Sequence, residues 1–216
     1  MVLFSVFIFV LNFVLNLVQS LKGGSYEFVF DDPDIFRKCY NQPENVLSIE
    51  DMFDLTEISR VMEDDVVNMS GNFTVGYKWE IEPTDRIEIY ISAYHWEVGD
   101  WQPTIFNIIY RDLCVAMNDP SNYWYLYVTQ HIINKDVMKE KCILYPGTKY
   151  YFEPYDVRFN ISSTGLAFNG RYKVEFKLQA YDQTNKLRPQ SICFICTGEC
   201  SKKFSYSRTG PLLTHL

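Results

Sequence analysis

The chain has 216 residues, 47% hydrophobic and 17% aromatic, which is enough to bury a sizeable core in one domain. Its formal net charge is −7 and its isoelectric point is about 5.0. This acidic balance argues against nucleic acid, whose phosphates require a basic face, and against electrostatic docking on anionic lipid.

The N-terminal segment predicts export. Residues 2–18 are almost unbroken in apolar side chains, and Ser20 supplies the small residue expected before a signal-peptidase cut. We expect residues 1–20 to be a signal peptide, although about 17 apolar residues also suffice for an uncleaved anchor. No repeat or linker divides the remainder, so we interpret 21–200 as one domain and 201–216 as a C-terminal tail. Stable membrane insertion is not expected.

Cysteines and sequons indicate the same compartment. An even number of cysteines in an exported chain favours disulfides, and three N-glycosylation sequons favour the secretory route. We therefore expect a secreted, extracellular glycoprotein. The six cysteines are Cys39, Cys114, Cys142, Cys193, Cys196 and Cys200, and the sequons begin at Asn68, Asn72 and Asn160.

Alternation of apolar and polar residues recurs along the chain and is typical of half-buried strands. It is clearest over 73–81, and after the turn residues 83–85 it resumes over 87–93, so 73–95 are expected to form a hairpin. Several short strands separated by turns predict a mainly β fold, either a sandwich or an open cup. Further strands are expected at 26–30, 60–67, 104–110, 149–160, 172–180 and 191–197.

One segment has helical spacing instead. Asp119-Pro120 resembles a helix start, and Trp124, Val128 and His131 follow at intervals of three and four residues. We predict one short helix near 120–133. Cys114 and Cys142 bracket it, so a disulfide between them would clamp the helix onto the sheet.

The sequence contains no nucleophile elbow, no HExxH motif and no Gly-rich phosphate loop. His95, His131 and His215 do not lie in a catalytic arrangement, and Cys193-x-x-Cys196 lies in a β-like run rather than at a helix start. We expect no enzymatic activity, no cofactor and no metal ion.

Aromatic side chains are abundant, with 16 Tyr and 16 Phe. They suit either an ordinary β core or the lining of a pocket for a chain-like apolar molecule. If a ligand binds between two sheets, alternation and aromatic bulk nominate the residues that contact it, although a register slip would invert any one strand. These residues are Trp79, Ile89, Phe106, Trp124, Phe159, Tyr172, Phe176 and Leu178.

A series of short motifs, in order over roughly residues 26–200, resembles the insect chemosensory CheB family, a branch of the ganglioside-activator-like, ML-type lipid-recognition proteins. Leu113 departs from the pattern, since the family has Phe there. The motifs are Ser70-Gly-Asn-Phe-Thr74, Thr84-Asp-Arg-Ile87, Gly99-Asp-Trp-Gln-Pro-Thr104, Trp124-Tyr125, Lys141-Cys142, Pro146-Gly-Thr148, Gly170-Arg-Tyr172, Arg188-Pro189 and Ser191-Ile-Cys-Phe194.

The resemblance implies an immunoglobulin-like β cup that admits a lipid between its sheets and acts in contact chemosensation, including pheromone perception. The implied ligand is a lipid, fatty acid or cuticular hydrocarbon. The resemblance also implies a Cys39–Cys193 bridge, which leaves Cys196 and Cys200 to each other, with Cys39–Cys196 as the rival pairing.

One other function remains open, and a third is not supported by the residues present. The alternative is a secreted co-receptor that modulates a sodium-channel-type receptor and has a filled core. A secreted hydrolase or oxidoreductase lacks its residues. A cavity of about 300 Å³ or more would distinguish a carrier from a co-receptor.

Export and glycosylation can be checked directly. N-terminal sequencing of the secreted protein should return a start near Leu21, and glycosidase treatment should shift its band. Asn72 is the favoured acceptor, with Asn68 and Asn160 less favoured. A start at Met1 would contradict the signal peptide, and an unshifted band would contradict the sugar.

Overall fold

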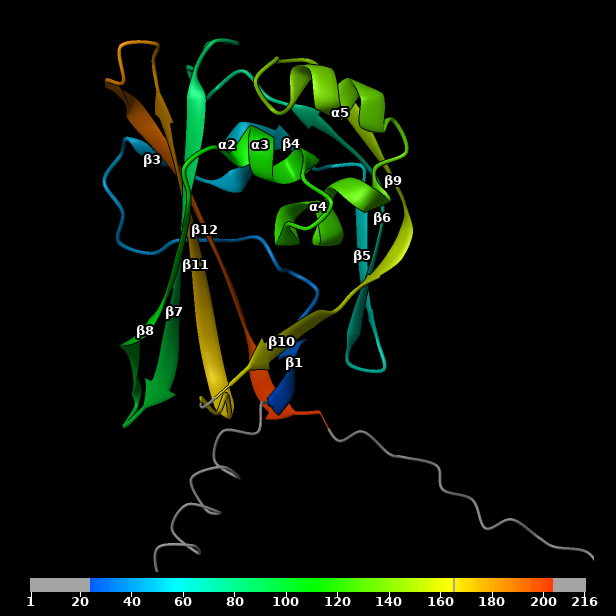
Figure 1. The fold of residues 1–216 in the computed structure, drawn as a ribbon, viewed down its shortest axis with the longest axis vertical. Coiled ribbons are helices and arrows are strands. Elements are labelled where there is room, and N and C mark those ends of the chain that lie inside the picture. The colour runs from blue at the N-terminus through cyan, green and yellow to red at the C-terminus, as the bar shows by residue number, and fades with distance from the viewer. Residues whose placement is uncertain (1–23, 165, 204–216) are drawn as a thin grey trace, which may run out of the picture.

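The computed structural model describes residues 24–164 and 166–203, so the predicted signal peptide and most of the predicted tail lie outside the described residues. Two β-sheets face each other, and short helices lie between them at one end (Figure 1). The mainly β sandwich or cup is therefore confirmed.

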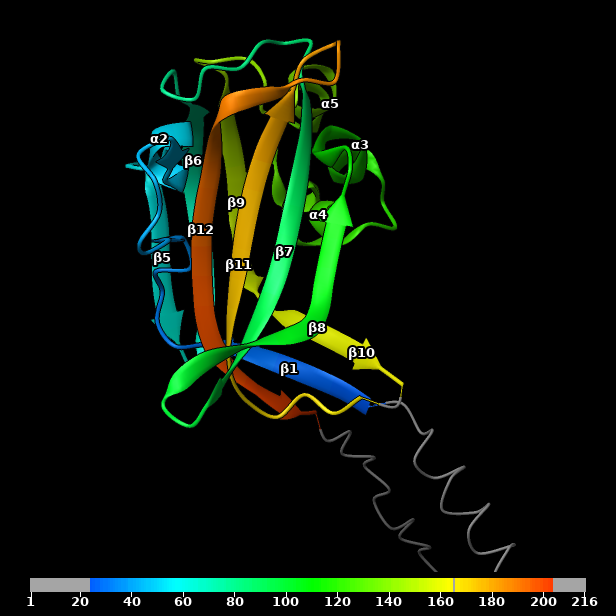
Figure 2. The same cartoon turned by 90° about the vertical axis from the view of Figure 1, so that its left-hand side faces the viewer.

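The first sheet runs in the order β10-β1-β12-β11-β7-β8, with β2 and β3 also pairing with β12 (Figure 2). The second sheet runs β4-β6-β5, and β9 pairs with β6. The first sheet contains β1 (Gly24–Phe30), β2 (Arg37–Lys38), β3 (Val46–Leu47), β7 (Arg86–Glu97), β8 (Asp100–Tyr110), β10 (Phe159–Ser163), β11 (Gly170–Tyr181) and β12 (Leu187–Lys202). The second contains β4 (Phe53–Asp54), β5 (Ile58–Glu63), β6 (Val66–Val75) and β9 (Lys149–Val157).

The sheets meet at the end away from the helices. Only Arg158 separates β9 of the second sheet from β10 of the first, so the chain passes directly between the layers there. At the other end the helices fill the space between the layers (Figure 1). The sandwich is therefore joined at one end and wedged open at the other.

The expected hairpin over 73–95 is wrong. β6 ends at Val75 in the second sheet, and after a crossing segment β7 begins at Arg86 in the first. The crossing is anchored because the buried Asp85 carboxylate accepts hydrogen bonds from Arg188 Nε and Nη2 at 2.9 and 2.8 Å. Alternation shows which residues face inward, but it does not show which strand will be the partner.

The strand expected over 60–67 is also divided. Asp64 and Asp65 both have positive φ, of 48° and 62°, and turn the chain between β5 and β6. A pair of left-handed residues is the conformation that a tight hairpin turn requires. The Asp64-Asp65 pair is therefore the feature of the sequence that indicates a turn within the expected strand.

The segment expected to hold one helix over 120–133 contains two short ones, with another on each side: α3 (Leu113–Asn118), α4 (Tyr123–Tyr127), η1 (Thr129–His131) and α5 (Lys135–Lys141), while α2 (Ile49–Met52) precedes β4. Asp119 ends α3 instead of starting the predicted helix, and Asn122 caps α4 through its side-chain oxygen. Val128, at φ −128° and ψ −67°, separates α4 from η1.

Two of the three expected disulfides are present. Cys114–Cys142 joins α3 to the end of α5 and is worth about 3–4 kcal/mol in the chain-entropy view, and Cys39–Cys193 ties the N-terminal part to β12. The Cys196–Cys200 bridge is wrong, because both residues lie in β12 and are unbonded. Four residues of extended strand span about 13 Å, whereas bridged Cα atoms lie within about 7 Å.

The sequons are not placed as expected. Asn72 lies half-buried within β6 rather than at the mouth of a hairpin, and Asn68 is half-buried in the same strand. Asn160 in β10 is exposed. Because an acceptor must be reachable from solvent, the structure favours Asn160 for the sugar.

The two unbonded cysteines give a test of this arrangement. Burial raises the pKa of Cys196 to about 12 and that of Cys200 to about 11, so little thiolate forms at neutral pH. We expect iodoacetamide to leave both thiols unmodified in the folded protein and to alkylate both after unfolding without reductant. Non-reducing peptide mapping should return the 39–193 and 114–142 pairs, and a fragment joining Cys196 to Cys200 would contradict the β12 geometry.

Candidate ligand cavity

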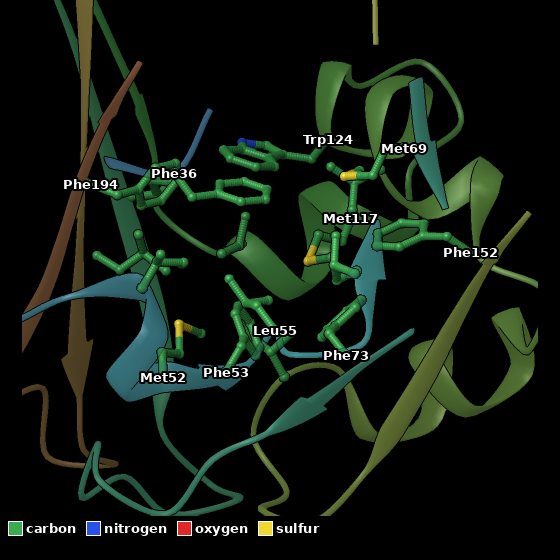
Figure 3. A pocket seen from close by; sticks show the side chains of 17 residues that line it. Phe36, Met52, Phe53, Leu55, Met69, Phe73, Met117, Trp124, Phe152 and Phe194 are labelled. Carbon is green, nitrogen blue, oxygen red and sulfur yellow. The ribbon is translucent and has the colours of Figure 1, made fainter. Parts of the chain in front are cut away.

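A cavity of about 110 Å³ lies between the two sheets beside the helices (Figure 3). Its 17 lining residues come from both layers and from the segments between them, so no single element forms it. They are Phe36, Ile49, Met52, Phe53, Leu55, Ile58, Met69, Phe73, Ile89, Leu113, Met117, Trp124, Val128, Ile143, Phe152, Leu178 and Phe194.

Strand periodicity positions the two opposing walls. Ile89, Leu178 and Phe194 come from neighbouring strands of the first sheet, in register as Ile89↔Leu178 and Phe176↔Phe194. The second sheet contributes Phe73 and Phe152, whose ring centroids are 5.4 Å apart. Both sets lie on the faces that the sheets turn toward each other, which is the arrangement expected for a sandwich core.

A β-bulge keeps the second wall apolar along its length. The buried residues of β9 change from even to odd positions between Phe152 and Tyr155, where the pairing with β6 shifts. The extra residue also accommodates Pro154, which cannot donate a ladder hydrogen bond. On β6, Gly71 has φ +103°, and a Cβ there would lie 2.0 Å from the Glu57 carbonyl oxygen, so a glycine is needed at this position.

Aromatic rings form a continuous row along the first wall. Phe176 and Phe194 stack with centroids 4.6 Å apart. Trp124 contacts Phe176 edge-to-face at 6.1 Å, and Phe36 contacts Phe194 in the same way at 5.8 Å. Contacts of this kind add to the energy of burial and fix the rings in place. The row therefore supports the cavity wall from α4 across to the segment before β2.

Three buried methionines, Met52, Met69 and Met117, face the cavity from three different elements. Figure 3 shows their sulfur atoms on separate sides of the space. Methionine is unbranched and polarizable, so it adapts to ligands of different shape at small cost. This wall can therefore rearrange more readily than one built from branched side chains.

No charged side chain lines the cavity, and the surface that the lining residues expose to it is entirely apolar. An apolar cavity of about 150 Å³ in another protein stays dry and binds benzene or xenon. At about 110 Å³, this cavity is smaller than the roughly 300 Å³ typical of pockets for drug-sized ligands, so it does not reach the size that the sequence analysis set for distinguishing a carrier from a co-receptor. It suits a small apolar molecule or one end of a longer one.

Half-buried lining residues mark where the cavity approaches solvent. Phe53, Leu55 and Ile58 follow α2 and lie along one side, while Trp124 on α4 and Val128 just after it lie along the other. The remaining sheet residues of the lining are buried. The rim is therefore formed by the short strand β4, the first residue of β5 and the helical segment, not by the long strands of the two sheets.

Of the residues nominated from the sequence, Ile89, Trp124 and Leu178 line the cavity, and Phe176 supports it from behind through Phe194. The other four lie elsewhere. Trp79 is buried and donates its indole N–H to the Gln190 carbonyl oxygen at 3.4 Å. Phe106 and Tyr172 pack with Phe168, while Phe159 packs between Phe30 and Tyr127.

Sequence reasoning missed most of the lining residues that lie outside the long strands. Met52 and Phe53 lie in short elements that carry no periodic pattern, and Met117 lies in α3, where no helix was expected. Phe73 and Phe194 had a usable signal, since both occupy inward positions of expected strands.

Titratable groups lie outside this lining. Cys39, Glu175 and Cys193 are the one grouping of metal-ligand type in the described part of the chain, and its two cysteines are joined in a disulfide. His95 bonds Glu97 at 2.8 Å, and His131 stacks on Tyr155 with centroids 3.8 Å apart. His215 lies outside the described residues.

No family model matches the chain, and no curated protein matches its sequence. Within residues 24–164 and 166–203, no helix is both long and apolar enough to cross a membrane. The two disulfides are compatible with an extracellular protein. Any function must therefore be inferred from the cavity and the surface.

The carboxylate of Asp51 holds the segment that carries Met52 and Phe53 in place. This interaction predicts that the stability of the fold depends on pH. Asp51 accepts hydrogen bonds from Lys78 Nζ at 2.8 Å and from Ser48 N at 2.9 Å, and these bonds lower its pKa from 3.8 to about 2. A depressed folded-state pKa stabilises the fold above about pH 4, and this contribution is lost as pH falls toward 2.

We expect Asp51→Asn to lower the free energy of unfolding at pH 6 by about 1 kcal/mol, because the charged acceptor is lost. Urea titrations should show that the difference in the free energy of unfolding between this variant and the wild type disappears between pH 4 and pH 2. Glu50→Gln, at the neighbouring exposed acid, is the control and should show a smaller gap. A gap that does not change with pH would contradict this role for the Asp51 charge.

Proposed function

We propose that this chain is a secreted, non-enzymatic protein that binds an apolar small molecule between its two sheets. The observation that carries the proposal is the cavity lining, whose 17 residues include no charged side chain and expose only apolar surface to the cavity. Concave, largely apolar sites with a few polar groups are the usual form of small-molecule sites.

The size of the cavity defines the kind of binding we propose. A volume of about 110 Å³ accommodates one small apolar molecule, or the terminal part of a longer chain whose remainder leaves through the rim. The buried methionines and the short helices at the rim supply the adaptability that a larger ligand would need. A lipid, fatty acid or cuticular hydrocarbon is consistent with this lining.

The resemblance to the CheB family supplies the proposed setting. In this proposal the protein belongs to that group, acts outside the cell and presents or removes an apolar pheromone in contact chemosensation. The ordered motifs support the family, and the two disulfides support an oxidising compartment.

A second candidate, the co-receptor that contacts a membrane receptor channel, is favoured by a different surface. β8 ends the first sheet and pairs with β7 alone among the described strands, which leaves its other backbone edge unpaired. Ile105 is 77% exposed, and Ile108 and Ile109 are also exposed on this strand. Long apolar edge strands readily pair with another chain.

Methyl NMR tests the cavity proposal directly. Titration with benzene should shift the methyl resonances of Met52, Met69 and Met117, which line the cavity. Met62 and Met138, which do not line it, are internal controls. Val128→Phe should weaken binding about tenfold or more, a loss of about 1.4 kcal/mol, because the larger side chain enters the same space.

Val115→Phe is the matched control, because Val115 is exposed on α3 and lies outside the lining. This variant should bind benzene like the wild type. If no lining methyl responds, or if both variants lose binding equally, the carrier proposal fails and the β8 edge becomes the favoured site of action.

A further inference from the structure

The first sheet ends in β8 on one side and in β10 on the other. Figure 2 shows β8 at the border of this sheet, with no described strand beyond it. The β10 end carries Asn160, the exposed sequon residue that the structure favours for a sugar, and a bulky glycan there would keep further strands away. The first sheet can therefore be extended at β8 but not at β10.

The β8 edge differs from the edges of the second sheet in its charge. Residues 101–110 carry no charged side chain. The edge strand β5 carries Arg60 and Glu63. The charged residues of β9, which also lies at an edge, are Lys149, Glu153 and Asp156. Charges on an edge strand hinder pairing with another chain, so β8 is the edge that lacks this protection.

Exposed isoleucines lie on both faces of β8. Ile108 lies opposite Ile91, which packs against the core, whereas Ile109 lies opposite Tyr90 on the outer face. Both isoleucines are exposed. A partner that packed on one face of the sheet would cover one of them, but a partner that added a strand would cover both. The exposed residues therefore favour pairing at the edge.

We propose that β8 pairs antiparallel with β8 of a second copy of this chain, so that the first sheets of two protomers form one continuous sheet. A strand paired in this way with its own copy has a two-fold axis perpendicular to the sheet, and two-fold dimers are the commonest oligomers. This inference does not depend on the cavity.

The sheet geometry fixes which residues meet. Residues directly opposite each other in an antiparallel pair point to the same face, so one residue at the axis faces its own copy. The ladder between β8 and β7 is regular from Asn107 to Tyr110. An axis at Ile108 places Phe106 opposite Tyr110 and Asn107 opposite Ile109. Pro103, which cannot donate a ladder hydrogen bond, stays outside the paired segment.

Charge favours a second copy as the occupant. Each chain has a formal net charge of −7, so two copies repel each other wherever their charged surfaces meet. Every pair in the segment 106–110 is uncharged, so this repulsion is absent along β8. A partner recognised through its charge would require charged residues on this segment, and there are none.

The helix α4 widens the contact beside the strand. Burial and the nearby Tyr123 phenol raise the pKa of Tyr110, which places Tyr123 beside the end of β8. Tyr123 and Leu126 of α4 are both exposed apolar side chains. A strand pair buries little area by itself, so these neighbours supply part of the surface that a stable dimer needs.

Sedimentation velocity over a range of concentrations tests the proposal on the secreted protein. The wild type should form dimers. Ile108→Lys should raise the dimer dissociation constant about tenfold or more, because two like charges then face each other at the axis. Val61→Lys is the matched control, since Val61 lies on the β5 edge and is 47% exposed, compared with 45% for Ile108. It should dimerise like the wild type.

Opposite charges at the axis should restore the contact. Ile108→Glu should also be monomeric by itself, but an equal mixture of the Ile108→Lys and Ile108→Glu proteins should form dimers. Ile108→Cys is a milder change. It should give a disulfide-linked dimer under mild oxidation, because each residue 108 faces its own copy, and Val61→Cys should not.

Three results would overturn the inference. The first is a wild-type protein that stays monomeric at every concentration, which would leave the β8 edge to a receptor. The second is a dimer that Ile108→Lys does not weaken, since the copies would then meet elsewhere. The third is a failure of both the mixed variants and Ile108→Cys to give dimers.

Discussion

The helical segment between β8 and β9 is the constraint on which the cavity depends. It enters from the first sheet and leaves into the second, and the Cys114–Cys142 bridge holds its two ends together. Because the segment is tied into a compact wedge, the sheets cannot close over it. At the opposite end the single residue between β9 and β10 forces the layers together. A cup follows from these two conditions.

β12 is a central strand of the first sheet and joins the strands on its two sides. It pairs with β11 along its length on one side and with β1, β2 and β3 in turn on the other. Its outward residues Cys193 and Ile195 pack with Cys39, while its inward residues Phe194 and Cys196 belong to the main core. A strand buried on both faces resists movement, so the first sheet is the fixed wall and the short elements opposite are the adjustable ones.

The two candidate functions use separate parts of the molecule. The cavity offers a concave, entirely apolar surface, which suits recognition of a small apolar molecule. The β8 edge offers exposed apolar side chains and unpaired backbone, which suits recognition of another chain. Both can operate in one protein, since occupation of the space between the sheets does not cover the edge of the first sheet.

The sequence by itself determined the β class, the inward residues of the long strands and the Cys114–Cys142 disulfide, while Cys39–Cys193 was implied only by the family resemblance. Period-two alternation is local, and Cys114–Cys142 brackets a segment that stands out from it. Tertiary structure decided the rest. β6 and β7 pair with different strands and therefore lie in different sheets, because the apolar face of a strand can be buried in either layer. An extended β12 kept Cys196 and Cys200 apart. The buried residues Met52 and Met117 line the cavity only because the helical segment places them between the two sheets, and such long-range packing cannot be read from a local sequence pattern.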